Sequence, residues 1–90
     1  DYRDALEHAT LELQRAVAAS DLGRIGAIVH RLKSSSRSVG ALAMGKLCTE
    51  IEGACTDQLP AAVLRAAQRW QHQHEATMAQ LGRALDAQAR

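Results

Sequence analysis

The sequence predicts an all-α fold, and more narrowly an antiparallel, up-down four-helix bundle. Alanine is abundant, phenylalanine is absent, and Tyr2 and Trp70 are the only Phe, Tyr or Trp residues among the 90. Runs of the β-branched and aromatic residues that favour strands are also missing. Apolar residues instead recur every three or four positions over four successive segments, which is the periodicity of amphipathic helices.

The first two predicted helices are separated by a short polar turn. The first should bury a stripe made of Leu6, Ala9, Leu13, Ala16 and Val17. It should end near Ser20, and Asp21 should cap the next helix, because its carboxylate can accept hydrogen bonds from free amides of the first turn. The second helix should run from Leu22 to about Ser38, with Gly40 suited to its C-terminal cap. Its predicted buried stripe contains Leu22, Ile25, Val29, Leu32, Ser36 and Val39.

The third helix is predicted from about Ala41 to Cys55. The fourth should begin near Pro60, because proline favours the first turn of a helix and the preceding residues have turn character. The third helix should bury Met44, Leu47, Cys48, Ile51 and Cys55. The fourth and longest should fray from Asp86 onward. Its predicted core positions are Val63, Ala67, Trp70, His74, Met78, Leu81 and Leu85. Short connections between four helices are typical of an up-down bundle.

Length and charge limit what the chain can do. A chain of 90 residues has room for one core, and we expect residues 1–90 to form a single domain cut from a longer protein. Eleven Lys and Arg against ten Asp and Glu give a formal charge of +1, too balanced for a nucleic-acid-binding domain. No apolar run approaches the ~18 residues that span a bilayer. We therefore expect no direct membrane contact and a cytoplasmic location.

The cysteines and histidines do not form a metal site in this interpretation. Cys48 and Cys55 lie seven residues apart on one predicted helix, about 10 Å along its axis, so they cannot form a disulfide with each other. They are predicted to be small buried residues in a reducing compartment. Neither has metal-ligand spacing with a histidine, and His72 and His74 point about 200° apart on a helix.

The candidate functional residue is His30, on the second predicted helix. At about 100° per residue, the apolar stripe lies more than a quarter-turn from His30, so its imidazole should be exposed and unpaired. Gly23 and Gly26 lie on the same face, although glycine inside a helix costs about 1 kcal/mol relative to alanine. Small residues beside an exposed histidine would let another protein approach it closely.

The histidine face is predicted to be cationic. No carboxylate occurs between Asp21 and Glu50, and the interval carries the basic residues Arg24, Arg31, Lys33, Arg37 and Lys46. Such a face would favour docking onto an acidic pocket and would stabilise a phosphoryl group. A neutral imidazole can accept phosphate from an acyl phosphate without an activating triad.

The segment from His30 to Ala41 resembles the signature of histidine-containing phosphotransfer (HPt) domains. His30-Arg31-Leu32-Lys33-Ser34-Ser35-Ser36, followed by Gly40-Ala41, is similar to the family pattern His-x-Leu-Lys-Gly-Ser-(Ser/Ala) and then Leu/Val-Gly-Ala. Downstream, Leu47-Cys48-Thr49-Glu50-Ile51-Glu52 resembles the family's Leu-Cys-x-x-Leu-Glu. The structural positions of the motif are then Leu32, Ser35, Gly40, Leu47, Cys48 and Glu52. Ser34 departs from the pattern, because glycine is usual there, and its side chain could restrict docking.

The resemblance implies a phosphorelay intermediate that lacks an ATP site and any intrinsic cofactor. His30 would accept a phosphoryl group from a receiver-domain aspartate and pass it to a response-regulator aspartate, with Lys33 stabilising the group. The receiver would supply the divalent metal. The partner-binding face would comprise Gly23, Gly26, Ala27, Arg31, Ser34 and Arg37. The parent implied by the resemblance is a bacterial hybrid sensor histidine kinase, with this chain as its C-terminal module and an anchor in the inner membrane.

Other functions would require sequence features different from those of an HPt domain. A non-catalytic helical adaptor or dimerisation module would need an apolar seam beyond the bundle core, and the outward faces instead carry Arg, Gln, Glu and Asp. A self-sufficient enzyme would need a nucleotide loop, a carboxylate pair or a triad, and none appears. Lys33 and Arg37 also suit a purely structural role, because cations near a helix C-terminus interact favourably with the helix dipole.

Overall fold

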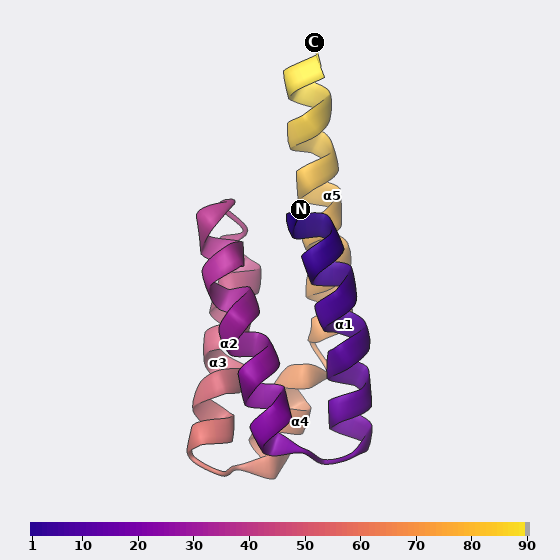
Figure 1. Ribbon diagram of the computed structural model, residues 1–90. Coiled ribbons are helices and arrows are strands. Elements are labelled where there is room, and N and C mark those ends of the chain that lie inside the picture. The colour runs from indigo at the N-terminus through magenta and orange to yellow at the C-terminus, as the bar shows by residue number, and fades with distance from the viewer. Residues whose placement is uncertain (90) are drawn as a thin grey trace.

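The computed structural model describes residues 1–89, and every regular element in that range is a helix. The elements are α1 (Tyr2–Ala18), α2 (Leu22–Ser38), α3 (Leu42–Thr56), α4 (Pro60–Ala67) and α5 (Trp70–Ala89). The long helices run alternately up and down in an elongated bundle of 47 × 19 × 19 Å (Figure 1). The predicted all-α, up-down bundle is confirmed, with α4 and α5 together in the place of the fourth helix.

Local signals account for the ends of α1 and α2. The N–H of Asp4 donates to Asp1 Oδ1 at 2.9 Å, and the N–H of Arg24 donates to Asp21 Oδ1 at 3.1 Å. Each helix therefore begins with a side-chain N-cap. After α2, Gly40 adopts a φ of +80°, a left-handed conformation that glycine tolerates without steric cost. The predicted caps at Asp21 and Gly40 are confirmed.

The core is built from the inward faces of α1 to α4 together with Trp70 at the start of α5. Its buried apolar residues are Leu6, Ala9, Leu13, Ala16, Ile25, Ile28, Val29, Leu32, Ala41, Met44, Leu47, Cys48, Ile51, Val63, Ala66 and Trp70. Ser36 is fully buried, as its place in the predicted stripe requires, and its Oγ lies 2.6 Å from the hydroxyl of Tyr2. This bond satisfies a polar group that would be costly to bury alone.

Some predicted core positions are wrong. Val39 is 48% exposed because α2 has ended one residue earlier, and Leu85 is 50% exposed because the last turns of α5 extend past the start of α1 (Figure 1). Residues that are only partly buried are Val17, Leu22, Cys55, Ala67, His74, Met78 and Leu81. Helix α5 extends to Ala89, so the segment predicted to fray from Asp86 is helical as far as that residue; Arg90 lies outside the described residues.

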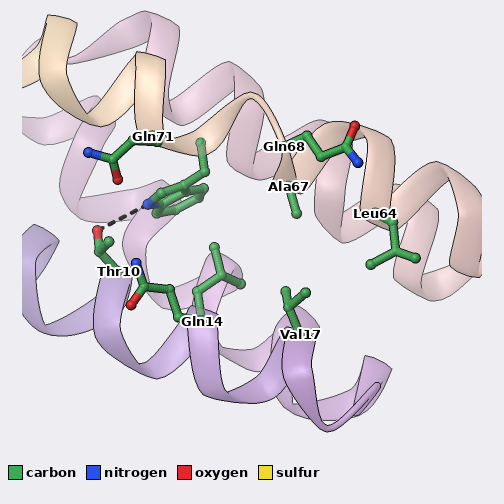
Figure 2. Close-up of a pocket in the computed structure, with 9 residues that line it drawn as sticks. Thr10, Gln14, Val17, Leu64, Ala67, Gln68 and Gln71 are labelled. Atoms are coloured by element: carbon green, nitrogen blue, oxygen red, sulfur yellow. Dashed lines mark hydrogen bonds between the residues drawn. The ribbon is translucent and has the colours of Figure 1, made fainter.

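The predicted fourth helix is interrupted at Gln68 and Arg69, between α4 and α5. Neither glycine nor proline occurs there, so the sequence contains no breaker signal. The break coincides with the burial of Trp70, whose indole Nε1 donates to Thr10 Oγ1 on α1 at 3.0 Å (Figure 2). We attribute the break to this tertiary packing, which overrides the local helical propensity.

A groove of about 370 Å³ opens beside Trp70, between α1, α4 and α5 (Figure 2). Its walls are apolar side chains such as Val17 and Leu64, and glutamine side chains stand around them. None of its lining residues is ionisable.

Within residues 1–89, no helix combines the length and apolar character needed to cross a bilayer.

Helices α2 and α3 lie side by side and together carry the histidine face (Figure 1). Gly45 of α3 is buried directly against α2: a Cβ at this position would lie 3.3 Å from Arg37 Cγ and 3.8 Å from the carbonyl oxygen of Lys33. The absence of a side chain therefore permits a close approach of the two helices. Two turns further along the same face of α3, the chain places Glu52 opposite α2.

Candidate functional site

His30 lies on α2, at the side of that helix that borders α3. Its side chain is 66% exposed, which confirms the predicted exposure. The expectation that it is unpaired is wrong, because Nδ1 forms a hydrogen bond with Glu52 Oε2. A carboxylate can only accept, so Nδ1 carries the hydrogen of this bond and Nε2 of the neutral ring keeps the lone pair.

Glu52 joins His30 to Lys33. Its Oε2 meets His30 Nδ1, and its Oε1 accepts a hydrogen bond of 2.5 Å from Lys33 Nζ. The Lys33 and Glu52 side chains are only 20% and 25% exposed, so this pair is better shielded than an ordinary surface ion pair. The bond from Lys33, and after it the bond from His30, lowers the pKa of the Glu52 carboxyl. Glu52 is therefore ionised at neutral pH.

The presence of Glu52 corrects the predicted charge of the histidine face. The sequence between Asp21 and Glu50 holds no carboxylate, but α3 brings one into contact with Lys33 and cancels its charge. Lys46 does not belong to this face, since it lines a separate depression with Glu50, Arg69 and His72. The histidine face is therefore less cationic than its own helix suggests.

His30 borders an open depression formed by α2 and the end of α3. The depression is lined by Leu22, Gly23, Gly26, Ala27, His30, Arg31, Glu52, Cys55, Thr56 and Gln58. Four predicted partner-binding residues, Gly23, Gly26, Ala27 and Arg31, are thus brought together around the histidine. Ser34 and Arg37 are exposed on α2 but do not line it. The sequence did not indicate that Cys55, Thr56 and Gln58 line this depression, because their position there depends on how the end of α3 is placed against α2.

The two glycines of this depression are not required by packing inside the domain. A Cβ at Gly26 would lie 3.5 Å from Cys55 Cβ, and a Cβ at Gly23 would lie 3.7 Å from Asp21 Oδ1. Both are ordinary contact distances, so an alanine would fit at either position. Because glycine in a helix costs about 1 kcal/mol relative to alanine, the fold alone gives no reason for these residues. Because these two residues have no side chain, nothing protrudes at their positions on the surface beside His30.

The remaining motif residues have structural places. Leu32, Leu47 and Cys48 are buried, and Ser35 Oγ donates to the carbonyl oxygen of Arg31 at 3.5 Å. Both cysteines are free, and burial raises the pKa of the Cys48 thiol to about 12, which keeps it neutral. The Arg37 guanidinium donates to Thr49 Oγ1 of α3 at 3.2 Å, so it braces the helix pair one turn beyond Lys33. Among residues 1–89, no three or more His, Cys, Asp or Glu side chains are grouped to hold a metal ion.

The lowered pKa of Glu52 predicts a pH-dependent stability. Because this pKa is lower in the folded than in the unfolded chain, the contacts of Glu52 contribute stability above the ordinary glutamate pKa. That contribution disappears as the pH falls through the folded value. We expect wild type to exceed Glu52→Gln at neutral pH by less than about 1 kcal/mol, because the pair is partly exposed. Thermal unfolding between about pH 3 and pH 7 should show this difference shrinking with acid, and a constant difference would contradict the assignment.

Comparison with known proteins gives one match. The model of the Hpt domain family matches residues 1–87, which include all of the site residues described above. Neither a curated protein nor a solved structure matches the chain.

Proposed function

Because the chain belongs to the Hpt domain family, we propose that it is a phosphorelay intermediate that carries a phosphoryl group on His30. Hpt domains transfer phosphoryl groups in two-component signalling, have no ATP site and interact with receiver domains. In the proposed step, Nε2 of His30 attacks the phosphorus of a receiver's aspartyl phosphate. A nitrogen–phosphorus bond forms, the oxygen–phosphorus bond breaks, and the aspartate leaves as a carboxylate. The reverse step on a second receiver passes the group on.

The observation that supports this proposal best is the contact between His30 and Glu52. It holds the imidazole at Nδ1 and leaves Nε2, the proposed nucleophile, on a side chain that is 66% exposed. A neutral imidazole with one fixed hydrogen is ready to attack without losing a proton first. Glu52 is thus proposed as the residue that positions His30, a role that the sequence did not assign to it.

Lys33 is proposed to stabilise the phosphoryl group. Its ammonium lies one helical turn from His30 and is bound to the same carboxylate. When the transferred group adds negative charge beside the ring, this ammonium can offset the charge through electrostatic attraction and hydrogen bonds. In this proposal Lys33 has a chemical role in addition to any interaction with the helix dipole.

The low surface around His30 supports a receiver domain as the partner. Gly23 and Gly26 keep one flank of the histidine low, and Arg31 offers an exposed cation beside it. In this proposal the donor is the receiver of a hybrid kinase and the acceptor is the receiver of a response regulator. The divalent metal that receiver chemistry needs would be bound by the receiver.

The proposal is tested by incubating the folded chain with a receiver domain that has been phosphorylated with acetyl phosphate and separated from excess donor. Intact-mass analysis should show one added phosphoryl group that is labile in acid and stable in base, as a phosphoramidate is. A folded chain that takes no phosphoryl group from any receiver of a broad panel would contradict the proposal and favour the adaptor interpretation.

The role of Lys33 predicts a difference between two single-charge variants. Lys33→Ala is expected to slow phosphoryl transfer about tenfold, because the transition state loses a cation beside the transferred group. Arg37→Ala removes the same charge one turn further on, where the guanidinium bonds to Thr49, and should change the rate by less than about twofold. Rapid-quench kinetics measure both rates, and equal effects would leave Lys33 without a specific role.

A further inference from the structure

Arg31 is shared by two surface depressions. It lines the depression that contains His30, and it also lines a second one between α1 and α2 together with His8, Glu12 and Ser35. Its side chain is 66% exposed, and Nη2 lies 3.5 Å from Oε1 of Glu12 on α1. The Arg31 side chain therefore contacts α1 through Glu12 and also lines the surface around His30.

Glu12 also has a contact on its own helix, although the His8 side chain that makes it is 77% exposed. The same Oε1 lies 3.2 Å from Nε2 of His8, one turn earlier on α1, and the Glu12 side chain is only 20% exposed. Its contact with Arg31 is long and reaches an exposed group, and pairs of this kind are easily given up. Glu12 thus reduces the effective charge of Arg31 at rest, and Arg31 can still leave it for a stronger anion.

The two cations that flank His30 on α2 are both matched by carboxylates of neighbouring helices. Lys33 meets Glu52 on α3 and Arg31 meets Glu12 on α1, but only Glu52 also contacts the histidine. Glu12 can therefore affect the surface charge beside His30 without touching the reacting group. An effect of Glu12 on partner docking can therefore be distinguished from an effect on the phosphoryl-transfer step.

We propose that Glu12 is a specificity-determining residue that slows the docking of acidic partners at His30 by holding Arg31 toward α1. The inference rests on the proposed function, in which the partner is a receiver domain that presents an aspartyl phosphate. A partner that offers an anion strong enough to recruit Arg31 overcomes the restraint, and a weakly acidic partner does not. Long-range attraction between charged surfaces acts mainly on the association rate, so the effect belongs there.

The test compares Glu12→Gln with Glu7→Gln. Both variants remove one negative charge from α1, but Glu7 faces His74 of α5 and not Arg31. With a receiver domain phosphorylated by acetyl phosphate, Glu12→Gln should raise the second-order rate constant of transfer about two- to threefold at low ionic strength. The gain should disappear in about 0.5 M salt, where charges are strongly screened. Glu7→Gln should transfer at the wild-type rate.

A double-mutant cycle with Arg31→Gln separates action through Arg31 from a general change in charge. If Glu12 acts by holding Arg31, Glu12→Gln has no effect on the rate once Arg31 is replaced, whereas a general charge effect persists. Circular dichroism and thermal unfolding of each variant verify that the bundle is folded. Transfer at saturating receiver should be the same in Glu12→Gln and wild type, because the contacts of His30 are unchanged.

The outcomes distinguish this inference from the proposed function. Three results would overturn the inference and leave the function standing: no gain in Glu12→Gln, an equal gain in Glu7→Gln, or an undiminished gain in the Arg31→Gln background. Failure of every phosphorylated receiver to transfer to the folded wild-type chain would overturn both.

Discussion

His30→Gln is expected to lower phosphoryl acceptance by at least about three orders of magnitude, because it removes the nucleophilic nitrogen. Its effect on folding should be small, since the His30 side chain is 66% exposed and the amide of glutamine can still donate to Glu52. We expect the free energy of unfolding to change by less than about 1 kcal/mol. Transfer from a phosphorylated receiver and thermal unfolding measure the two effects.

The matched control for His30→Gln is His72→Gln. His72 is also exposed, but it lies on α5 in a different depression, so this variant should accept phosphate at the wild-type rate. Residual acceptance in His30→Gln would show a second acceptor in the chain. A severe loss of stability would show instead that the bond between His30 and Glu52 is needed for the α2–α3 pair to form.

Ile51→Ala is expected to cause the largest loss of stability among the variants considered, about 2–5 kcal/mol. Ile51 is fully buried on α3, directly before Glu52, and the truncation would leave a cavity between helices. For a domain of this size such a loss lowers the Tm by at least about 8 °C. Urea unfolding measures the free energy, and the midpoint should move without a change in slope.

Leu42→Ala is the control for Ile51→Ala. Leu42 lies in the first turn of the same helix but is 67% exposed, so its truncation should change stability by less than about 0.5 kcal/mol. Similar losses in the two variants would contradict the assignment of the core to the inward face of α3. They would also remove the physical reason for the position of Glu52, which depends on that packing.

The boundaries of α1, α2 and α3 could be predicted because their signals are local. Asp21 caps the helix that follows it, Gly40 ends the helix before it, and apolar spacing identifies which face is buried. The break between α4 and α5 could not be predicted from such signals. It follows from the burial of Trp70 against Thr10, residues that are 60 positions apart in the chain.

The candidate site was predictable only in part, for the same reason. His30 and Lys33 lie one turn apart on one helix, so their proximity follows from helical geometry alone. The bridge through Glu52 needs the register between α2 and α3, which depends on the close contact at Gly45. One sequence feature does point to it: Gly45, Cys48 and Glu52 are spaced three to four residues apart, so they share a face of α3.

The pairing of Lys33 with Glu52 also explains how a histidine face that is less cationic than its own helix suggests can still suit phosphoryl transfer. Glu52 removes the net charge of Lys33 before the partner arrives, yet the ammonium remains in place beside the histidine. A phosphoryl group on Nε2 would bring its own negative charge to this cluster, and Lys33 could then divide its hydrogen bonds between the two anions.

The position of the phosphoryl group on the imidazole ring would show which atom of the chain is the acceptor. Heteronuclear NMR of the chain after phosphorylation by a receiver domain distinguishes the two ring nitrogens of each histidine. The geometry predicts a single phosphoryl group on Nε2 of His30, with Nδ1 still protonated and bonded to Glu52. Attachment at Nδ1, or at any residue other than His30, would contradict the account.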